Sequence, residues 1–407
     1  MSDAEKSYVA PQATTRVSEA PRKIFLSPVI GKKFSATENN QGEVTITNPY
    51  MNPDAMFFTK AAGLVCTADG GLIVAGNAGL DPRGYVLATG YWTTSPVGAV
   101  TPLYTRSARA YAKSHGAKCD APYGKVMPDP APFARAPGGT LLKAVDYALT
   151  RIEADGYVSR VAGAPYACEE DGTPSKVRGL VDGARDTARF DRITELAVDS
   201  RGTAWIADQN GCSLRKVTSD GQVTTVIPPD VGCSTAGAPE DRLGLEHLTW
   251  DEAHGELVSV HDFPVARPVH DWYTTIWRIK PTGEFRRVSF TTKGGHGPTK
   301  TAVDGIQSSI AVDPQGRIHY GTRLMKNSSI LLIVRLDAAT GAVVPVTGGK
   351  FAAGEDTERK PRDGPAGRAY FNHIEGMCFS PDGTLFALDE HLVRKLEKTG
   401  TISTWLF

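Results

Sequence analysis

One turn motif recurs six times along this chain at nearly even spacing. In five copies an arginine opens a short strand-like run that reaches a glycine five or six residues later, as in Arg215 to Gly221 and Arg394 to Gly400. Trp92 and Gly98 form a weaker sixth copy. The copies begin at positions 92, 151, 215, 278, 335 and 394, so the intervals lie between 57 and 64 residues. A long-period repeat of strand units that cannot each bury a face alone is typical of a β-propeller.

Residues 182–226 show one unit in most detail. We expect an inner strand over 195–199, a second strand over 203–208, a third over 214–218 and an outer strand over 223–226. Glycine turns separate the first strand from the second and the third from the fourth. The segment 363–405 repeats this order. These units predict an all-β fold, a six-bladed β-propeller built from four-stranded antiparallel blades.

The repeat also decides the domain organisation. The length of 407 residues would by itself allow two or three domains, but one repeat spans most of the chain. We expect a flexible arm over residues 1–40 and one propeller over 41–407. The strand-like run 42–47 is expected to join the last blade or to precede the first, where it would cover an exposed sheet edge. The six blades are expected near 44–104, 105–165, 182–228, 240–290, 303–348 and 363–407.

The charge balance and the hydropathy pattern exclude several classes of partner. Lys plus Arg and Asp plus Glu number 45 each, so no net field attracts a nucleic acid. No run of about 18 apolar residues is present, so we expect no membrane partner. We also expect a monomer. Residues 1–25 lack the apolar stretch of a secretion signal, which favours the cytoplasm.

The six cysteines divide into two groups. Cys66 and Cys378 lie in apolar strands, and we expect them to be small buried hydrophobic residues. The other four lie in Gly- and Pro-rich sequence, where a disulfide such as Cys212 with Cys233 would require an oxidising, extracellular location. This loop group is Cys119, Cys168, Cys212 and Cys233.

The repeat unit resembles the NHL repeat. The same series of features occurs over 182–226 and again over 363–405. It begins with a DG lead-in and a later A-x-F, continues with an inner strand that closes near D-x-x-G and a second strand that ends in Asp, and ends with an Arg-Lys third strand. The resemblance covers about residues 60–407 and implies a propeller of the NHL and gluconolactonase-like superfamily. Members of this family serve as protein-binding modules, RNA readers, lyases and lactonases, so the fold alone leaves the activity open.

Short and long connections are distributed unevenly. The turns between strands one and two and between strands three and four are minimal, whereas the links between blades and the link 261–275 are long. In an up-and-down meander the long links emerge together, on what we call the loop face, and the short turns lie on the opposite turn face. We expect a protein or small-molecule ligand to bind the loop face. The links between blades are 104–137, 162–190, 227–245, 289–307 and 347–373.

Polar residues are expected around the channel mouth on the loop face. Inner strands begin there with Glu195, with Glu246 and His247, and with Glu375. Such oxygen- and nitrogen-rich convergence suits one divalent cation (Ca, Mg, Mn or Zn), which can polarise a carbonyl or activate water. Glu195 and Glu375 are the candidate metal ligands. The alternative interpretation is that these carboxylates are hydrated and keep the channel wet.

Second strands place further candidates one layer out. His261 and His270, each followed by Asp, bracket one loop, and such pairs can orient imidazoles for proton transfer. Asp208 and Asp389 end second strands, and we favour a structural role for both, capping loop N–H groups. The candidate ligand-binding set is Glu195, Asp208, Glu246, His247, His261, His270 and Asp389, and the catalytic candidates are His247, His261 and Glu375.

Two expectations concern orientation and packing. Glu195 and Glu375 are one residue out of register, so we expect them to point to opposite sides of their blades. The arginine of each third strand is expected to link blades, with its stem over apolar surface and its head on carbonyls or carboxylates.

The resemblance implies two kinds of activity. Glu375 before Gly376 matches the inner-strand Glu that gluconolactonase-type propellers place on a divalent metal, and His247 fits one of the three zinc-binding histidines of NHL-type amidating lyases. The leading prediction is an NHL-like binding module that uses its loop face. The alternative is a divalent-metal-dependent hydrolase, lactonase or lyase at the channel mouth.

Overall fold

The structure is a computed structural model, and it describes a defined part of the chain. The described residues are 35–38, 44–47, 58–80, 86–96, 100–107, 132–145, 147–152, 158–163, 167–168, 174–175, 178–208, 211–233, 243–264, 272–292, 303–324, 327–336, 343–347, 363–366, 368–369, 371–389 and 392–406.

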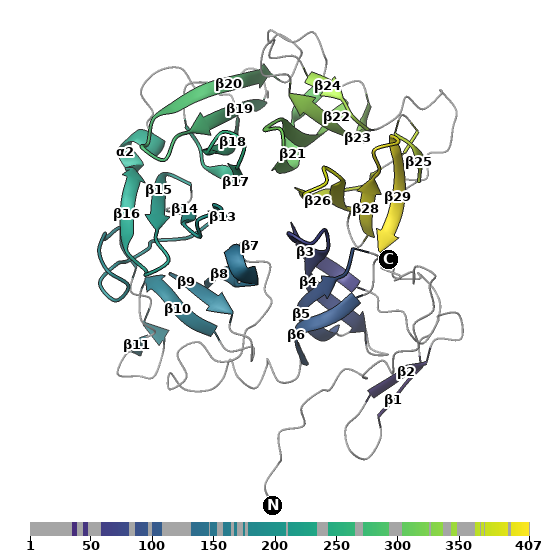
Figure 1. Ribbon diagram of the computed structural model, residues 1–407, viewed down its shortest axis with the longest axis horizontal. Coiled ribbons are helices and arrows are strands. Elements are labelled where there is room, and N and C mark those ends of the chain that lie inside the picture. The colour runs from purple at the N-terminus through teal and green to yellow at the C-terminus, as the bar shows by residue number, and fades with distance from the viewer. Residues whose placement is uncertain are drawn as a thin grey trace, which may run out of the picture.

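Six antiparallel sheets stand around a central axis and form a closed ring (Figure 1). The inner strands contact one another in chain order around the channel, and the inner strand of the last blade contacts that of the first. The prediction of an all-β, six-bladed propeller of four-stranded blades is confirmed. No described helix is long and apolar enough to cross a membrane.

Each of the first three blades has four strands from the channel outward. Blade 1 consists of β3 (Phe58–Cys66), β4 (Leu72–Leu80), β5 (Val86–Thr94) and β6 (Val100–Ser107). Blade 2 consists of β7 (Phe133–Arg135), β8 (Leu141–Val145), β9 (Ala148–Ile152) and β10 (Val158–Gly163). Blade 3 consists of β13 (Glu195–Val198), β14 (Ala204–Asp208), β15 (Ser213–Val217) and β16 (Val223–Ile227).

The remaining blades continue the pattern. Blade 4 consists of β17 (Glu246–Asp251), β18 (Glu256–Pro264), β19 (Trp272–Ile279) and β20 (Phe285–Thr292). Blade 5 consists of β21 (Val303–Val312), β22 (Ile318–Leu324), β23 (Asn327–Leu336) and β24 (Val343–Pro345). Blade 6 consists of β26 (Ile374–Phe379), β27 (Leu385–Asp389), β28 (Leu392–Leu396) and β29 (Thr401–Leu406), with a short fifth strand, β25 (Gly364–Pro365), outside β29.

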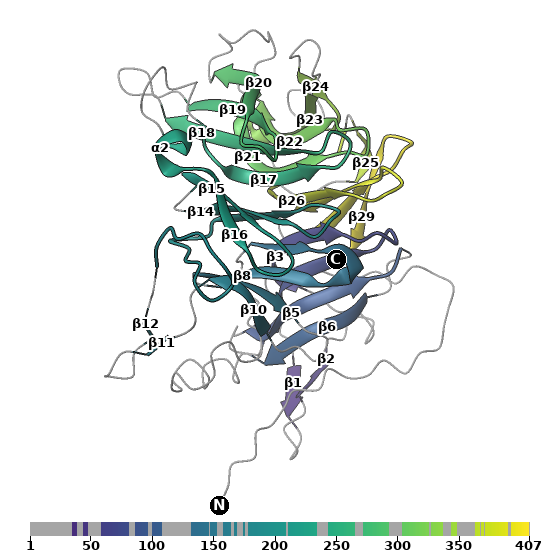
Figure 2. The same ribbon diagram turned by 60° about the vertical axis from the view of Figure 1, so that its left-hand side comes forward.

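A few short elements lie outside this scheme. They are the hairpin of β11 (Ala167–Cys168) and β12 (Pro174–Ser175), the 3₁₀ turn η1 (Pro137–Gly139) and the helix α2 (Pro229–Gly232). The strand β2 (Val44–Thr47) pairs with β1 (Ser35–Glu38) in a separate hairpin that both views place beyond the ring (Figures 1 and 2). Of the two placements expected for this strand, joining the last blade is not what the described residues show, because β1 supplies its ladder; the other, a position before the first blade, stays a prediction.

The cores lie between neighbouring blades. Successive side chains on a strand point to opposite faces of the sheet, so each inner strand serves two interfaces. Leu196 packs in one cluster with Leu149 of blade 2, whereas the next residue, Ala197, packs with Leu257 of blade 4. Every blade is therefore held by apolar contacts on both sides.

In blades 3 and 6 a buried arginine joins the third strand to the second strand and to the segment that leads into the same blade. The guanidinium of Arg215 lies 3.1 Å from Asp208 and 2.8 Å from Asp182, and the Phe190 ring lies below it. The equivalent Arg394 binds Asp389 and Asp363, each at 2.9 Å, above Phe371. In blade 4, Arg278 binds Asp251 and also donates to the Gly316 carbonyl of blade 5 at 2.8 Å. The expected head-group contacts with carboxylates or carbonyls are confirmed for these three arginines, whereas among the described residues a hydrogen bond to another blade is made by Arg278 alone of the three.

A disulfide closes the ring. Cys66 of β3 and Cys378 of β26 are bonded, with their Cα atoms 5.6 Å apart and 312 residues between them in sequence. The prediction that both are free buried thiols is wrong, because the first and last inner strands are neighbours only after the ring has closed. The pairing of Cys212 with Cys233 is confirmed. Among the described cysteines, none is free.

Candidate functional site

The short turns lie where the sequence predicts them. In the turn after β13 the Gly202 N–H donates to the Asp199 carbonyl at 2.9 Å, and in the turn after β15 the Gly221 N–H donates to Thr218, also at 2.9 Å. Positive φ angles of 83° and 89° explain why both positions are glycine. These turns define the turn face. The long links expected on the loop face fall largely outside the described residues.

The inner strand of blade 4 begins with a β-bulge at the channel mouth. The register of β17 against β18 shifts between Glu246 and Thr249. Within the bulge His247 has a φ of 50°, and it is the one non-glycine residue of the described set with a positive φ. A left-handed residue at a bulge is a feature that accumulates at functional sites, where it redirects side chains and backbone groups.

Glu195 of blade 3 binds this bulge. Its carboxyl accepts hydrogen bonds from the backbone N–H groups of His247 and Leu248, and so joins two inner strands at the mouth. Burial, the largest influence, raises the pKa of Glu195 to about 7, and the neighbouring Glu246 carboxylate raises it further against the effect of the two N–H donors. Glu195 therefore holds its proton about half of the time at neutral pH.

Two histidines stand beside this pair of carboxyls. Burial lowers the pKa of His247, so its ring is neutral at pH 7. The Nδ1 atom of His261, on β18, lies 3.7 Å from Oε2 of Glu246, and the two side chains are 20% and 49% exposed. Glu195, Glu246, His247 and His261 are thus brought together as the sequence predicts, from two neighbouring blades.

Gly244 makes room for His261. A Cβ at position 244 would lie 1.9 Å from the His261 Nδ1, so no other residue fits without moving the ring. The Gly244 carbonyl also accepts a hydrogen bond from Ser259 at 2.8 Å. The sequence analysis missed Gly244, although a glycine two residues before a candidate Glu is a usable signal.

Glu375 lies in a different part of the mouth. It belongs to blade 6, and β26 and β13 stand on opposite sides of the central opening (Figure 1). The Nδ1 atom of His373 lies 3.6 Å from Oε1 of Glu375. A bulge between Ile374 and Gly376 interrupts the alternation of side chains, so the predicted orientation of Glu375 stays a prediction.

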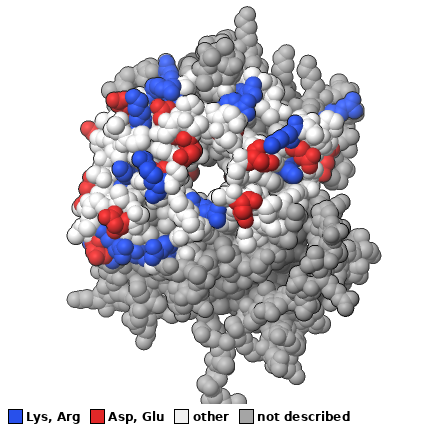
Figure 3. Space-filling model, viewed as in Figure 1, with Lys and Arg blue, Asp and Glu red and all other residues white. Residues whose placement is uncertain are grey.

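The two candidate metal ligands therefore do not share one cluster. Among the residues that the structure describes, no group of three or more His, Cys, Asp or Glu is arranged to hold a metal ion. The space-filling view shows the central opening bordered by both acidic and basic side chains (Figure 3).

Asp208 and Asp389 are committed to structure. Asp389 Oδ1 accepts the N–H groups of Asn372 and His373 at 2.8 and 2.9 Å, while Oδ2 binds Arg394. Asp208 is likewise fully buried and binds two loop N–H groups and Arg215. This is the capping role that the sequence favours. His270 lies outside the described residues.

Comparisons with known proteins give distant likenesses only. No protein-family model matches the chain, so the NHL resemblance stays a prediction, and no curated protein matches it. A streptogramin B lyase structure is 13% identical, with a TM-score of 0.37, over 91% of this chain and 87% of that one. Virginiamycin B lyase from Staphylococcus aureus is 11% identical, with a TM-score of 0.38, over 84% and 94%.

A gluconolactonase from Xanthomonas campestris is 14% identical, with a TM-score of 0.39, over 67% of this chain and 73% of that one. Likenesses at this level say nothing about what this chain binds or converts.

Proposed function

We propose that this protein binds a small organic cation at the loop-face mouth of its channel, between blades 3 and 4. One observation supports the proposal above others. The Glu195 carboxyl, with a pKa of about 7, has another carboxylate, Glu246, as its charged neighbour. Two carboxyls held together by the fold repel one another when both are ionised, and a ligand ammonium group relieves that repulsion.

The surroundings favour a ligand that also carries a hydroxyl group. The His261 ring is close to Glu246 and remains 20% exposed, so it can exchange a hydrogen bond with such a group. The Glu246 side chain is 49% exposed and can be reached from the channel mouth. An amino alcohol combines both features, and ethanolamine is the smallest probe of this class.

Proton release distinguishes this site from unspecific binding. Ethanolamine should bind with loss of up to about half a proton at pH 7, because the cation favours the ionised form of Glu195. The measurement is isothermal titration calorimetry in phosphate and in HEPES, whose different ionisation enthalpies reveal the protons released. At pH 9, where Glu195 is already ionised, no proton should be released.

Matched variants locate the effect. Glu195→Gln should remove the proton release, and Glu246→Gln should weaken binding about tenfold. Glu284→Gln removes a 69% exposed carboxylate of blade 4, which is paired with Lys280, and should leave both quantities unchanged. Absence of ethanolamine binding at millimolar concentration, or binding without proton release, contradicts the proposal.

A second candidate function is acid–base catalysis of hydrolysis or elimination at the same mouth. The Glu195 carboxyl, with a pKa of about 7, accepts from the backbone N–H of His247, whose neutral imidazole could serve as the base. A sugar δ-lactone, followed by pH-stat with and without Ca, Mg, Mn or Zn, is the direct probe. Hydrolysis that falls at least about a hundredfold in Glu195→Gln supports this function, and a rate equal to that of buffer contradicts it.

A further inference from the structure

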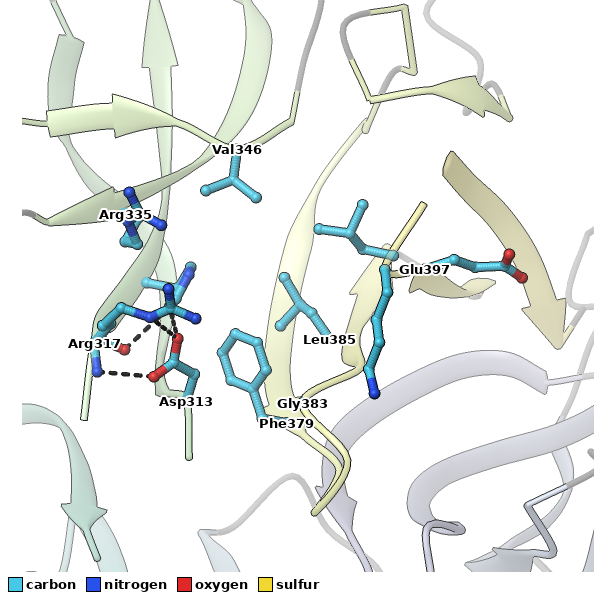
Figure 4. Close-up of a pocket in the computed structure, with 11 residues that line it drawn as sticks. Asp313, Arg317, Arg335, Val346, Phe379, Gly383, Leu385 and Glu397 are labelled. Atoms are coloured by element: carbon cyan, nitrogen blue, oxygen red, sulfur yellow. Dashed lines mark hydrogen bonds and ion pairs between the residues drawn. The ribbon is translucent and has the colours of Figure 1, made fainter. Parts of the chain in front are cut away.

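A second cavity lies far from the channel mouth, between blades 5 and 6 on the turn face. It has a volume of about 190 Å³. One wall comes from blade 5 and is polar, with Asp313, Arg317, His319 and Arg335 (Figure 4). The facing wall comes from blade 6 and is apolar, with Phe379, Leu385 and Leu396.

The charges on the polar wall do not cancel. Asp313 is neutralised locally, since its Oδ2 accepts a hydrogen bond from Nε of Arg317 at 2.6 Å and its Oδ1 accepts the Arg317 N–H at 2.9 Å. Burial lowers the pKa of His319 to about 4, so this ring is uncharged at pH 7. The cation that remains on the wall is Arg335.

Among the described residues, Arg335 makes no guanidinium contact of the kind that the equivalent arginines of other blades make. It lies opposite His319 on the neighbouring strand and is only partly exposed. Its guanidinium makes no hydrogen bond or ion pair with any residue that the structure describes. Arg215, Arg278 and Arg394, the equivalent arginines of three other blades, are all buried and paired with carboxylates. Arg335 is therefore the member of this series that is left with its donors available.

The other charged residues at the rim have partners elsewhere. Glu397 lies 3.8 Å from Lys395, and its carboxylate points away from the cavity in Figure 4. Lys398 lies 3.7 Å from Asp382, a residue that does not line the cavity. No unpaired carboxylate therefore competes for Arg335 on the described walls.

We infer that this cavity is a binding site for an aryl carboxylate, with the carboxylate on Arg335 and the ring against Phe379, Leu385 and Leu396. A planar guanidinium binds a carboxylate through two parallel hydrogen bonds. A small number of polar groups opposite an apolar wall is the usual composition of a small-molecule site. Inorganic phosphate satisfies only the polar wall, and a neutral aromatic amide satisfies only the apolar one.

The test uses benzoate as the probe and the full chain as the protein. Titration calorimetry or ligand-observed NMR should show saturable binding of benzoate, and binding at least about tenfold weaker for benzamide, acetate and inorganic phosphate. Arg335→Gln should weaken benzoate binding at least about tenfold. The affinity of Arg335→Lys should lie between those of the wild type and Arg335→Gln, because lysine keeps the charge but loses the planar guanidinium.

Control variants separate this site from general charge effects. Arg286→Gln removes a 57% exposed arginine of blade 4 and should leave benzoate binding unchanged. Unchanged circular dichroism and melting temperature confirm that Arg335→Gln is folded. The inference is overturned if benzoate does not bind at millimolar concentration, if benzamide or phosphate binds equally well, or if folded Arg335→Gln binds benzoate like the wild type.

Discussion

At the residue scale, Glu195 and Asp208 show how one blade uses two carboxyls differently. Both accept two backbone N–H groups from a neighbouring segment. Asp208 also has Arg215 at 3.1 Å, whereas Glu195 has Glu246 as its charged neighbour. An arginine compensates for burial of the first carboxylate, and nothing equivalent among the described residues compensates for the second. This difference makes Asp208 part of the scaffold and Glu195 a group that exchanges a proton near neutral pH.

The raised pKa of Glu195 predicts a pH-dependent loss of stability. The folded-state pKa is about 7 and the ordinary value is 4.5. Between these values the folded state binds more protons than the unfolded state, so the free energy of unfolding falls as the pH rises through this window, by at most about 3 kcal/mol. Below pH 4.5 and above pH 7 this group has no further effect.

Urea unfolding at pH 5 and pH 7 measures the loss. The difference between the two pH values should be smaller in Glu195→Gln by about the amount that Glu195 contributes. Glu284→Gln, at an exposed position, serves as the matched control and should keep the wild-type difference. An identical pH dependence in wild type and Glu195→Gln contradicts the assigned pKa.

The Arg394 network predicts unequal effects of its two aspartates. Asp389 is fully buried, and Asp389→Ala leaves the buried Arg394 charge and two loop N–H groups poorly compensated. We expect this variant to lower the free energy of unfolding by about 3 kcal/mol. Asp363 is 48% exposed, and its loss should cost clearly less. Chemical denaturation of both variants measures the contrast, and equal losses would count against the network.

At the element scale, most strands follow from the sequence. In blade 3 the predicted strands and the observed β13 to β16 differ by one residue or less at most of their ends, because alternation and turn glycines mark both. The bulge in β17 was not predicted, since a bulge has no residue signature when its left-handed position is a histidine. The bulge in β26 was not predicted either. Glu195, Glu246, His247 and His261 were found because they stand at strand ends on adjacent blades.

The cavity between blades 5 and 6 could not be found from the sequence. Its walls combine residues from 313 to 346 with residues from 379 to 398, and only the closed arrangement of blades brings them together. In the sequence, Arg335 begins the same Arg-to-Gly motif as the arginines that are paired with carboxylates, so the motif does not distinguish it from them. Whether such an arginine finds a partner among the described residues depends on what the neighbouring strand supplies.

The left-handed backbone at residue 247 predicts which substitutions there will lower the stability of the protein. A φ of 50° is tolerated by Asn and disfavoured for β-branched residues. His247→Asn should therefore leave the melting temperature nearly unchanged, whereas His247→Val should lower the free energy of unfolding by about 1–2 kcal/mol more than the Asn variant does. Thermal unfolding of the two variants, which both remove the imidazole, isolates the backbone effect. Equal stability of the pair would argue against a left-handed residue here.

At the scale of the whole molecule, a covalent bond joins the first blade to the last. The two cysteines of the Cys66–Cys378 bond are 312 residues apart in sequence, and those of the Cys212–Cys233 bond are 21 residues apart. In the chain-entropy model the longer loop contributes about 6 kcal/mol and the shorter about 3 kcal/mol. Such bonds persist in oxidising compartments.

Paired serine variants test this order. Cys66→Ser with Cys378→Ser should lower the melting temperature more than Cys212→Ser with Cys233→Ser, because opening the ring frees the edges of blades 1 and 6. A thiol count on the unfolded, unreduced wild-type protein should detect no free thiol from the four cysteines of these two bonds. A larger loss from the Cys212 and Cys233 pair would show that ring closure depends mainly on non-covalent contacts.

The most direct test of the proposed ligand site is a carboxyl ¹³C NMR titration of Glu195, with the resonance assigned from Glu195→Gln. In the free protein the midpoint should lie near pH 7. Saturating ethanolamine should shift it downward, because a cation at the mouth stabilises the ionised form. A midpoint near the ordinary value of 4.5 that ethanolamine does not move would contradict the account.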